Sequence, residues 1–210
     1  MKVLQDHSVI PVLVIEDASW AKDLGAALVA ANLPIVEVTL RTPASWSAAE
    51  AMRQVDGLTL GIGSVTQVDD LKRGKDLGID FAVSAGISRD LVDAASAHSI
   101  PYIPGVATPS EILLAVKLGL SVVKWFPAET LGGIAALKAM SAPFPKMRFV
   151  PTGGITASNA PQYLNESHVF AVGGSWMFAK DAMAAKDLSK ISEAAQIAAR
   201  LSAVNSKEAR

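Results

Sequence analysis

Short β-branched apolar runs alternate along the chain with longer segments rich in alanine and leucine. Several of the short runs are apolar at every position, a pattern typical of parallel strands buried on both faces. The pattern predicts eight strands, at residues 9–15, 34–40, 58–62, 81–84, 101–103, 121–125, 148–150 and 169–172. It predicts helices at residues 18–31, 44–55, 68–77, 89–97, 109–118, 134–140 and 157–164, and a long closing helix at 182–204.

Eight successive β–α units predict an α/β protein, a single-domain (β/α)8 TIM barrel over residues 1–204. The 210 residues are close to the lower limit of roughly 200 for this fold, so insertions must be short. A doubly wound open sheet is the structural alternative. No linker rich in proline, glycine or serine divides the chain, and the polar tail at 205–210 is expected to fray.

The charge balance argues against several classes of partner. With a formal net charge of −1, no global field attracts the protein to nucleic acid or to an acidic membrane. The chain has no cysteine, which excludes a disulfide or a cysteine nucleophile and suits a cytoplasmic protein. The apolar run at 8–15 is expected to be the first strand rather than a signal peptide, because Pro11 interrupts it and Glu16 and Asp17 close it.

In a barrel the functional residues are expected at the carboxyl ends of the strands. In the second predicted strand, Glu37, Thr39 and Arg41 share one parity and would face the barrel interior. A buried carboxylate and guanidinium are costly unless they are paired or used in function. The pattern therefore indicates either a catalytic acid beside a binding cation or a Glu37–Arg41 pair that only stabilises the core.

Lys124 lies between apolar residues at the end of the sixth predicted strand. Lysine is rarely buried, and burial or a nearby cation disfavours its charged form. A neutral amine is the species that attacks a carbonyl carbon, so this position suits a lysine that forms a Schiff base. The alternative is a lysine whose stem is buried while its ammonium group reaches the barrel mouth and binds nothing.

Two glycine turns follow the last two predicted strands, at 153–154 and 173–174, and Ser175 comes directly after the second. Phosphate sites recur at this place in barrels, because glycine allows backbone N–H groups to approach an anion closely. Ser64 ends the third strand and either offers a hydroxyl to a carboxylate or only completes a tight turn. Glu129 is expected only to order the helix that follows it.

Neither a metal nor a nucleotide cofactor is expected. The three histidines are scattered, with no His, Asp and Glu at ligand spacing. Residues 61–63 lack the rest of a dinucleotide fingerprint.

Taken together, the strand-end segments resemble the 2-keto-3-deoxy-6-phosphogluconate (KDPG) and 4-hydroxy-2-oxoglutarate (KHG) aldolase family. The matching segments occur in the family's order and extend from the first strand to the eighth. They are residues 11–14, 37–42, 104–105, 124–129, 151–155 and 173–176. The resemblance implies a class I, Schiff-base aldolase that cleaves KDPG to pyruvate and glyceraldehyde 3-phosphate, with KHG cleavage to pyruvate and glyoxylate as a second reaction. It also implies a homotrimer that needs no bound cofactor and no partner beyond its phosphorylated keto-acid substrate.

The resemblance also implies roles for individual residues. Lys124 would be the Schiff-base lysine and Glu37 the general acid/base. Arg41 would hold the substrate carboxylate, Phe126 would form an apolar wall, and Thr152 would line the site. Ser64 is a further candidate for substrate binding. The phosphate would be bound by Gly153, Gly154, Gly174 and Ser175.

Two residues depart from the family pattern, namely Ser64, where threonine is usual, and Ala85, where proline is usual. The relative that cleaves the galacto epimer of KDPG typically lacks the Thr-Leu-Arg-Thr run and the Ser-Trp pair. Both are present here, at 39–42 and 175–176, which favours the gluconate substrate. Two other functions stay open at this point: a phosphate-binding barrel isomerase and a non-catalytic phosphosugar-binding protein.

Overall fold

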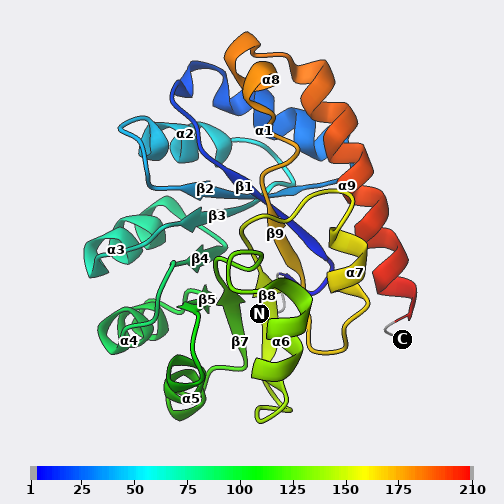
Figure 1. Cartoon of the computed structure of the whole chain (residues 1–210). Coiled ribbons are helices and arrows are strands. Elements are labelled where there is room, and N and C mark those ends of the chain that lie inside the picture. The colour runs from blue at the N-terminus through cyan, green and yellow to red at the C-terminus, as the bar shows by residue number, and fades with distance from the viewer. Residues whose placement is uncertain (1–3, 209–210) are drawn as a thin grey trace.

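The structure, a computed structural model, describes residues 4–208, with side chains described up to residue 201. Its strands are parallel and occupy the centre of the molecule, surrounded by helices (Figure 1). They are β1 (Val9–Leu13), β2 (Ile35–Thr39), β3 (Thr59–Gly63), β4 (Phe81–Val83), β5 (Tyr102–Ile103), β6 (Gly105–Val106), β7 (Val122–Trp125), β8 (Arg148–Pro151) and β9 (Val172–Gly174).

The strands form a curled sheet that closes on itself. Six pair in the order β5-β4-β3-β2-β1-β9 and three in the order β6-β7-β8. Two parallel bridges, Phe149–Val169 and Thr152–Gly173, join β8 to the β9 side. This closure confirms the predicted barrel and excludes the open sheet. The structure adds one short strand that the sequence pattern did not predict, β6, which Pro104 separates from β5 because proline has no N–H with which to continue a ladder.

The helices lie on the outside of the barrel (Figure 1). They are η2 (Ala18–Trp20), α1 (Ala21–Ala30), α2 (Ser45–Met52), α3 (Val68–Leu77), α4 (Arg89–Ala97), α5 (Pro109–Lys117), α6 (Gly133–Ser141), α7 (Ala160–Leu164), α8 (Lys180–Ala185) and α9 (Leu188–Glu208). The bounds of α3 and α4 coincide with those predicted. No helix among residues 4–208 is both long and apolar enough to cross a membrane.

The long closing helix predicted at 182–204 is wrong, because two helices occupy this region. Lys186 adopts a left-handed backbone conformation (φ 52°), which ends α8. Asp187 then accepts a hydrogen bond from the Lys190 N–H at 3.1 Å and begins α9. Helix α9 continues to Glu208, and residues 209–210 lie outside the described part of the chain. The expected fraying of the tail at 205–210 stays a prediction.

Close packing at Gly61 in β3 leads to a stability prediction. A Cβ atom at Gly61 would lie 2.3 Å from Cζ of Phe81, the residue that it pairs with on β4. Gly61→Ala is therefore expected to lower the free energy of unfolding by about 1–3 kcal/mol, as overpacking of a core does. Urea unfolding measures the change.

Gly86 provides the matched control, since a Cβ atom there would meet nothing within 4 Å. Gly86→Ala is expected to change the free energy of unfolding by less than about 0.5 kcal/mol. Equal effects of the two substitutions would contradict this account of the packing around Phe81.

Candidate active site

A small cavity of about 120 Å³ lies at the carboxyl ends of the strands. Its lining residues are Val12, Arg41, Lys124, Phe126, Thr152, Gly153, Gly154, Ile155, Gly174 and Ser175. Eight of the ten residues that the sequence singled out are in this set. The other two, Glu37 and Ser64, each contact one of the lining residues.

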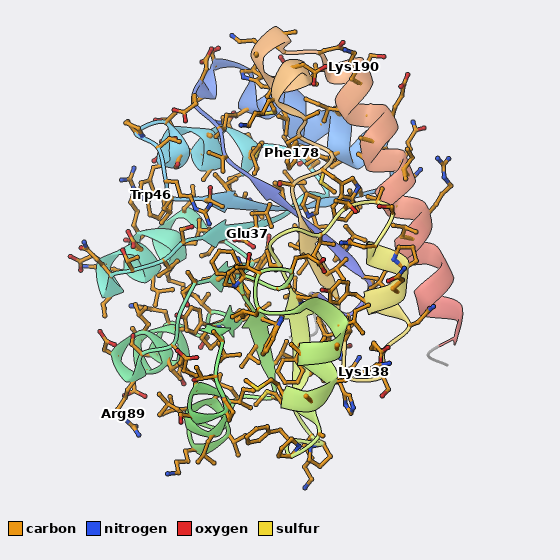
Figure 2. The ribbon with its side chains drawn as sticks, in the orientation of Figure 1. Glu37, Trp46, Arg89, Lys138, Phe178 and Lys190 are labelled. Atoms are coloured by element: carbon orange, nitrogen blue, oxygen red, sulfur yellow. The ribbon has the colours of Figure 1, made fainter. Side chains whose placement is uncertain are left out.

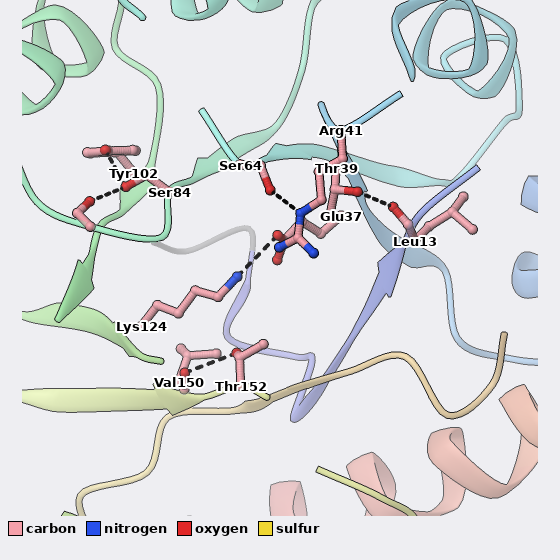
Figure 3. A network of polar contacts seen from close by, with 11 residues as sticks. Leu13, Glu37, Thr39, Arg41, Ser64, Ser84, Tyr102, Lys124, Val150 and Thr152 are labelled. Atoms are coloured by element: carbon pink, nitrogen blue, oxygen red, sulfur yellow. Dashed lines mark hydrogen bonds and ion pairs between the residues drawn. The ribbon is translucent and has the colours of Figure 1, made fainter. Parts of the chain in front are cut away.

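Lys124 and Glu37 meet inside the barrel, from β7 and β2 (Figure 3). The distance from Lys124 Nζ to Glu37 Oε1 is 3.3 Å, and each residue is only 3% exposed. Figure 2 places Glu37 near the centre of the ring of strands, whereas Lys138 and Lys190 lie at its outside. The strand parity that predicted an inward carboxylate on β2 therefore agrees with the structure.

Glycine makes room for this carboxylate. A Cβ atom at Gly63, on the neighbouring strand β3, would lie 2.0 Å from Glu37 Oε1. Only a residue without a side chain allows Glu37 to occupy its position beside Lys124. The strand-end glycine at position 63 thus serves the interior of the barrel as well as the turn.

The predicted inward direction of Arg41 holds in part, because Arg41 lines the same cavity as Lys124. The residue is exposed, and its Nε donates a hydrogen bond to Ser64 Oγ at 2.8 Å. Arg41 lies beyond the end of β2, so the alternation of a strand no longer sets its direction. Among the described residues Arg41 forms no ion pair with Glu37, so the alternative of a Glu37–Arg41 pair that only stabilises the core is not borne out. Arg41 instead borders the cavity from its mouth.

Ser64 orients its hydroxyl toward Arg41 from a strained backbone position. It follows β3 directly and has a φ of 58°, the left-handed region that few residues other than glycine adopt. The sequence allows two interpretations of Ser64: it offers its hydroxyl to a carboxylate, or it only completes a tight turn. The structure shows a tight turn, and the Ser64 hydroxyl holds the Arg41 guanidinium.

Phe126 and Thr152 complete the walls around Lys124. The Phe126 ring centroid lies 5.4 Å from Lys124 Nζ. Thr152 is buried, and its hydroxyl donates to the Val150 carbonyl at 3.2 Å (Figure 3). The amine is therefore enclosed by an aromatic ring and by groups already engaged within the protein.

Both predicted glycine segments border the cavity, but only the first is a turn, because Gly174 is the last residue of strand β9. The Thr152–Gly173 bridge brings the end of β8 beside β9, so residues 153–154 and 174–175 border the same space. Gly153 and Gly154 have φ values of 97° and 78°, which residues with a side chain rarely adopt. Backbone N–H groups of this kind are suited to binding an anion.

Comparison with known proteins agrees with this arrangement. A family model described as KDPG and KHG aldolase matches residues 1–194. The chain belongs to this family. A 2-dehydro-3-deoxy-phosphogluconate aldolase of Zymomonas mobilis is 44% identical over 175 residues, which are 83% of this chain and 84% of the relative.

Two solved structures of KDPG aldolases are also similar. The Zymomonas mobilis enzyme with 3-phosphoglycerate has a TM-score of 0.90 and 41% identity, over 95% of this chain and 94% of its own. The Legionella pneumophila enzyme, with pyruvate captured as a covalent carbinolamine intermediate, has a TM-score of 0.88 and 38% identity, over 92% and 95% of the two chains.

The departures from the KDPG aldolase pattern lie at different distances from the cavity. Ser64 contacts a lining residue, as described above. Ala85 is exposed and does not line the cavity. Its carbonyl oxygen occupies the space that a Cβ atom at Gly105 would need. The second departure therefore affects the packing of the β4 loop against β6 rather than the cavity wall.

Sequence reasoning missed two lining residues, Val12 and Ile155. Both are apolar. Val12 is on β1, where all five positions are buried and no alternation marks the inward face. Its register partner is Glu37, so the pairing of β1 with β2 is the signal that would have found it.

Proposed function

We propose that this protein is a class I aldolase that cleaves KDPG to pyruvate and glyceraldehyde 3-phosphate through a Schiff base on Lys124. The observation that carries the proposal is the buried Lys124–Glu37 contact beside a cavity that two glycine segments border. Membership of the KDPG and KHG aldolase family supports it. The expected cytoplasmic location and homotrimer are part of the same proposal.

The proximity of the two groups suits the first step, in which the Lys124 amine attacks the C2 carbonyl carbon of the substrate. A buried charge is unfavourable unless it is compensated. Lys124 and Glu37 compensate each other when both are ionised, and both become neutral when the proton passes from the amine to the carboxylate. The second state contains the nucleophile. Attack forms a carbinolamine, and Glu37 then donates its proton to the departing hydroxyl, so that loss of water gives a protonated imine and a Glu37 carboxylate.

The imine then accepts the electrons of the C3–C4 bond. Glu37 removes the proton of the C4 hydroxyl, the C3–C4 bond breaks, and glyceraldehyde 3-phosphate leaves. The enamine of pyruvate remains on Lys124. Glu37 returns a proton to C3, and water hydrolyses the imine to release pyruvate. Positioned acid/base groups contribute roughly 10²–10⁴-fold, so the imine and the orientation of the substrate supply the rest.

The cavity offers different binding groups to the two ends of such a substrate. Arg41 would hold the carboxylate at the mouth beside Ser64, and the segments at 153–154 and 174–175 would hold the phosphate. Phe126 would limit water near the imine. Cleavage of KHG to pyruvate and glyoxylate would use the same lysine and carboxylate without the phosphate contacts.

The two other functions predict different chemistry. A phosphate-binding isomerase would use the same glycine segments but would not form an imine, and a non-catalytic binding protein would bind without turnover. Neither requires a buried lysine in contact with a buried carboxylate. The geometry therefore favours the aldolase.

Reduction with borohydride tests the nucleophile directly. In the presence of pyruvate, borohydride is expected to inactivate the protein and to leave a reduced three-carbon adduct on Lys124, detected by peptide mass spectrometry. Lys124→Met removes the amine and should abolish both adduct and turnover. Lys72→Met, at an exposed position on α3, is the control that should retain them. An adduct on another lysine would disprove the assignment.

Glu37→Gln is expected to separate imine formation from proton transfer. The amide keeps the size of the side chain but is not a base, so turnover should fall by about 10²-fold or more while pyruvate trapping persists. Steady-state kinetics and borohydride trapping are measured on the same preparation.

The control for Glu37→Gln is thermal unfolding, because the substitution removes the partner of a buried lysine and can destabilise the fold. A folded Glu37→Gln protein that cleaves KDPG at a near-normal rate would show that another group moves the proton.

Chelation is expected to leave cleavage unchanged. Among the described residues no three His, Asp or Glu side chains are grouped so that they could hold a metal ion. The rate is measured before and after dialysis against EDTA. Loss of turnover that a divalent metal restores would point to a metal-dependent aldolase instead.

A further inference from the structure

Glu129 does not act as its position in the sequence suggested. It follows β7 and was expected to order the next helix, but its carboxylate accepts a hydrogen bond from the Tyr163 hydroxyl. Tyr163 is fully buried on α7, the helix after β8, which lies beside α6 and β9 in Figure 1. The contact therefore joins the loop after the lysine strand to the helix that follows the 153–155 loop.

Glu129 also holds the backbone of the 153–155 loop. Its N–H donates to the Gly153 carbonyl at 3.1 Å, and the preceding Ala128 N–H donates to the Thr152 carbonyl at 2.8 Å. The Cβ and Cγ atoms of Glu129 would each lie 2.6 Å from a Cβ atom at Gly154. The aliphatic part of Glu129 thus packs directly on Gly154, while Tyr163 fixes its carboxylate.

Asn159 engages the loop from the next turn of the chain. Its Nδ2 donates to the Gly154 carbonyl at 3.1 Å, and its Oδ1 accepts from the Thr156 N–H at 2.8 Å. The carbonyls of Gly153 and Gly154 are therefore both bonded within the protein.

The direction of these carbonyls sets the direction of the N–H groups. In a trans peptide the N–H points opposite to the C=O of the same unit. The N–H groups of Gly154 and Ile155 consequently point away from Glu129 and Asn159. Neither donates to an acceptor in the described part of the chain, and both residues line the cavity. Two free donors at the cavity wall are the arrangement that binds a phosphate oxygen.

Electrostatics favour a fixed position for Glu129. Burial, together with the hydrogen bond to Glu129, raises the pKa of the Tyr163 hydroxyl, so the hydroxyl keeps its proton and stays a donor. A negative charge free to move near the loop would repel a phosphate. The Tyr163 hydroxyl ties the carboxylate toward α7, and Glu129 is not one of the residues that line the cavity.

We propose that Glu129 and Tyr163 are positioning residues that hold the 153–155 loop in its anion-binding shape. On this basis they determine how strongly the enzyme prefers a phosphorylated substrate to an unphosphorylated one. The inference rests on the proposed function, in which this loop receives the phosphate, and extends it to two residues that contact neither substrate nor reacting atoms.

The experiment compares two substrates that differ in the phosphate. Tyr163→Phe removes one hydroxyl and keeps the ring. The ratio of kcat/KM for KDPG to that for KHG is expected to fall about tenfold, the effect of one lost hydrogen bond to a charged group. The fall in the ratio should come from a higher KM for KDPG. Glu129→Gln, whose amide oxygen still accepts the hydroxyl, should keep the ratio within about threefold of the original.

Tyr102→Phe is the matched control. The chain has two tyrosines, and Tyr102 is also buried with its hydroxyl bonded to a side chain, Ser84 at 2.6 Å, away from the cavity lining. Its removal is expected to leave the substrate ratio unchanged. A folded Tyr163→Phe protein with the original ratio, or with equal losses on both substrates, would overturn the positioning role. A larger fall in the substrate ratio for Glu129→Gln than for Tyr163→Phe would also overturn the positioning role.

Calorimetric binding of inorganic phosphate separates this inference from the proposed function. The unmodified protein should bind phosphate, and Tyr163→Phe should bind it about tenfold more weakly. Equal affinity, or no binding to the unmodified protein, would overturn the inference even if pyruvate trapping succeeds. Failure of trapping on Lys124 would overturn the Schiff-base function and would leave the phosphate measurement as the test of the loop.

Discussion

The contact between Lys124 and Glu37 is the constraint on which the rest of the structure depends. Two ionisable groups that are almost fully buried are tolerated because each compensates the other across 3.3 Å. The contact requires two strands that are far apart in the sequence to face each other, which a closed barrel provides. It also requires a glycine at position 63, since any side chain there would displace the carboxylate.

The site divides its tasks between rigid strands and shaped loops. In the proposed function, the strands position the nucleophile and the acid, whose side chains must be placed accurately for catalysis. Anion recognition would come from the strand ends instead, through the Arg41 guanidinium at the mouth and the backbone of the glycine segments. Backbone N–H groups bind an anion only if the loop has the right shape, so the contacts behind a loop matter as much as the residues in it.

Sequence reasoning succeeded where the determinants are local. Helix α3 has a capping box formed by Gln67 and Asp70 and ends at Gly78 in the left-handed conformation, all of which are readable along the chain. The strand parity of Glu37 and the apolar surroundings of Lys124 were likewise local, and both residues lie where they were expected. The proline that divides β5 from β6 was a local signal too, and it was overlooked.

The predictions failed where the residues that determine the local structure are distant in the sequence. The break at Lys186 accompanies an ion pair with Asp17, 2.6 Å away in space and 169 residues away in the chain. Arg41 is exposed rather than buried in the barrel because β2 ends two residues earlier, and a strand end is set by its neighbours in the sheet.

The Glu129–Tyr163 contact shows the functional consequence of such distant pairing. Its two residues lie on separate β–α units, and no local pattern in the sequence pairs Glu129 with Tyr163. The loop between them is shaped by packing and hydrogen bonds that do not reach Lys124 or Glu37 directly. If this loop receives the phosphate, as proposed, phosphate affinity can change by substitutions behind the loop while Lys124 and Glu37 stay in place. The proposed reaction and the proposed preference for a phosphorylated substrate would then be physically separable properties.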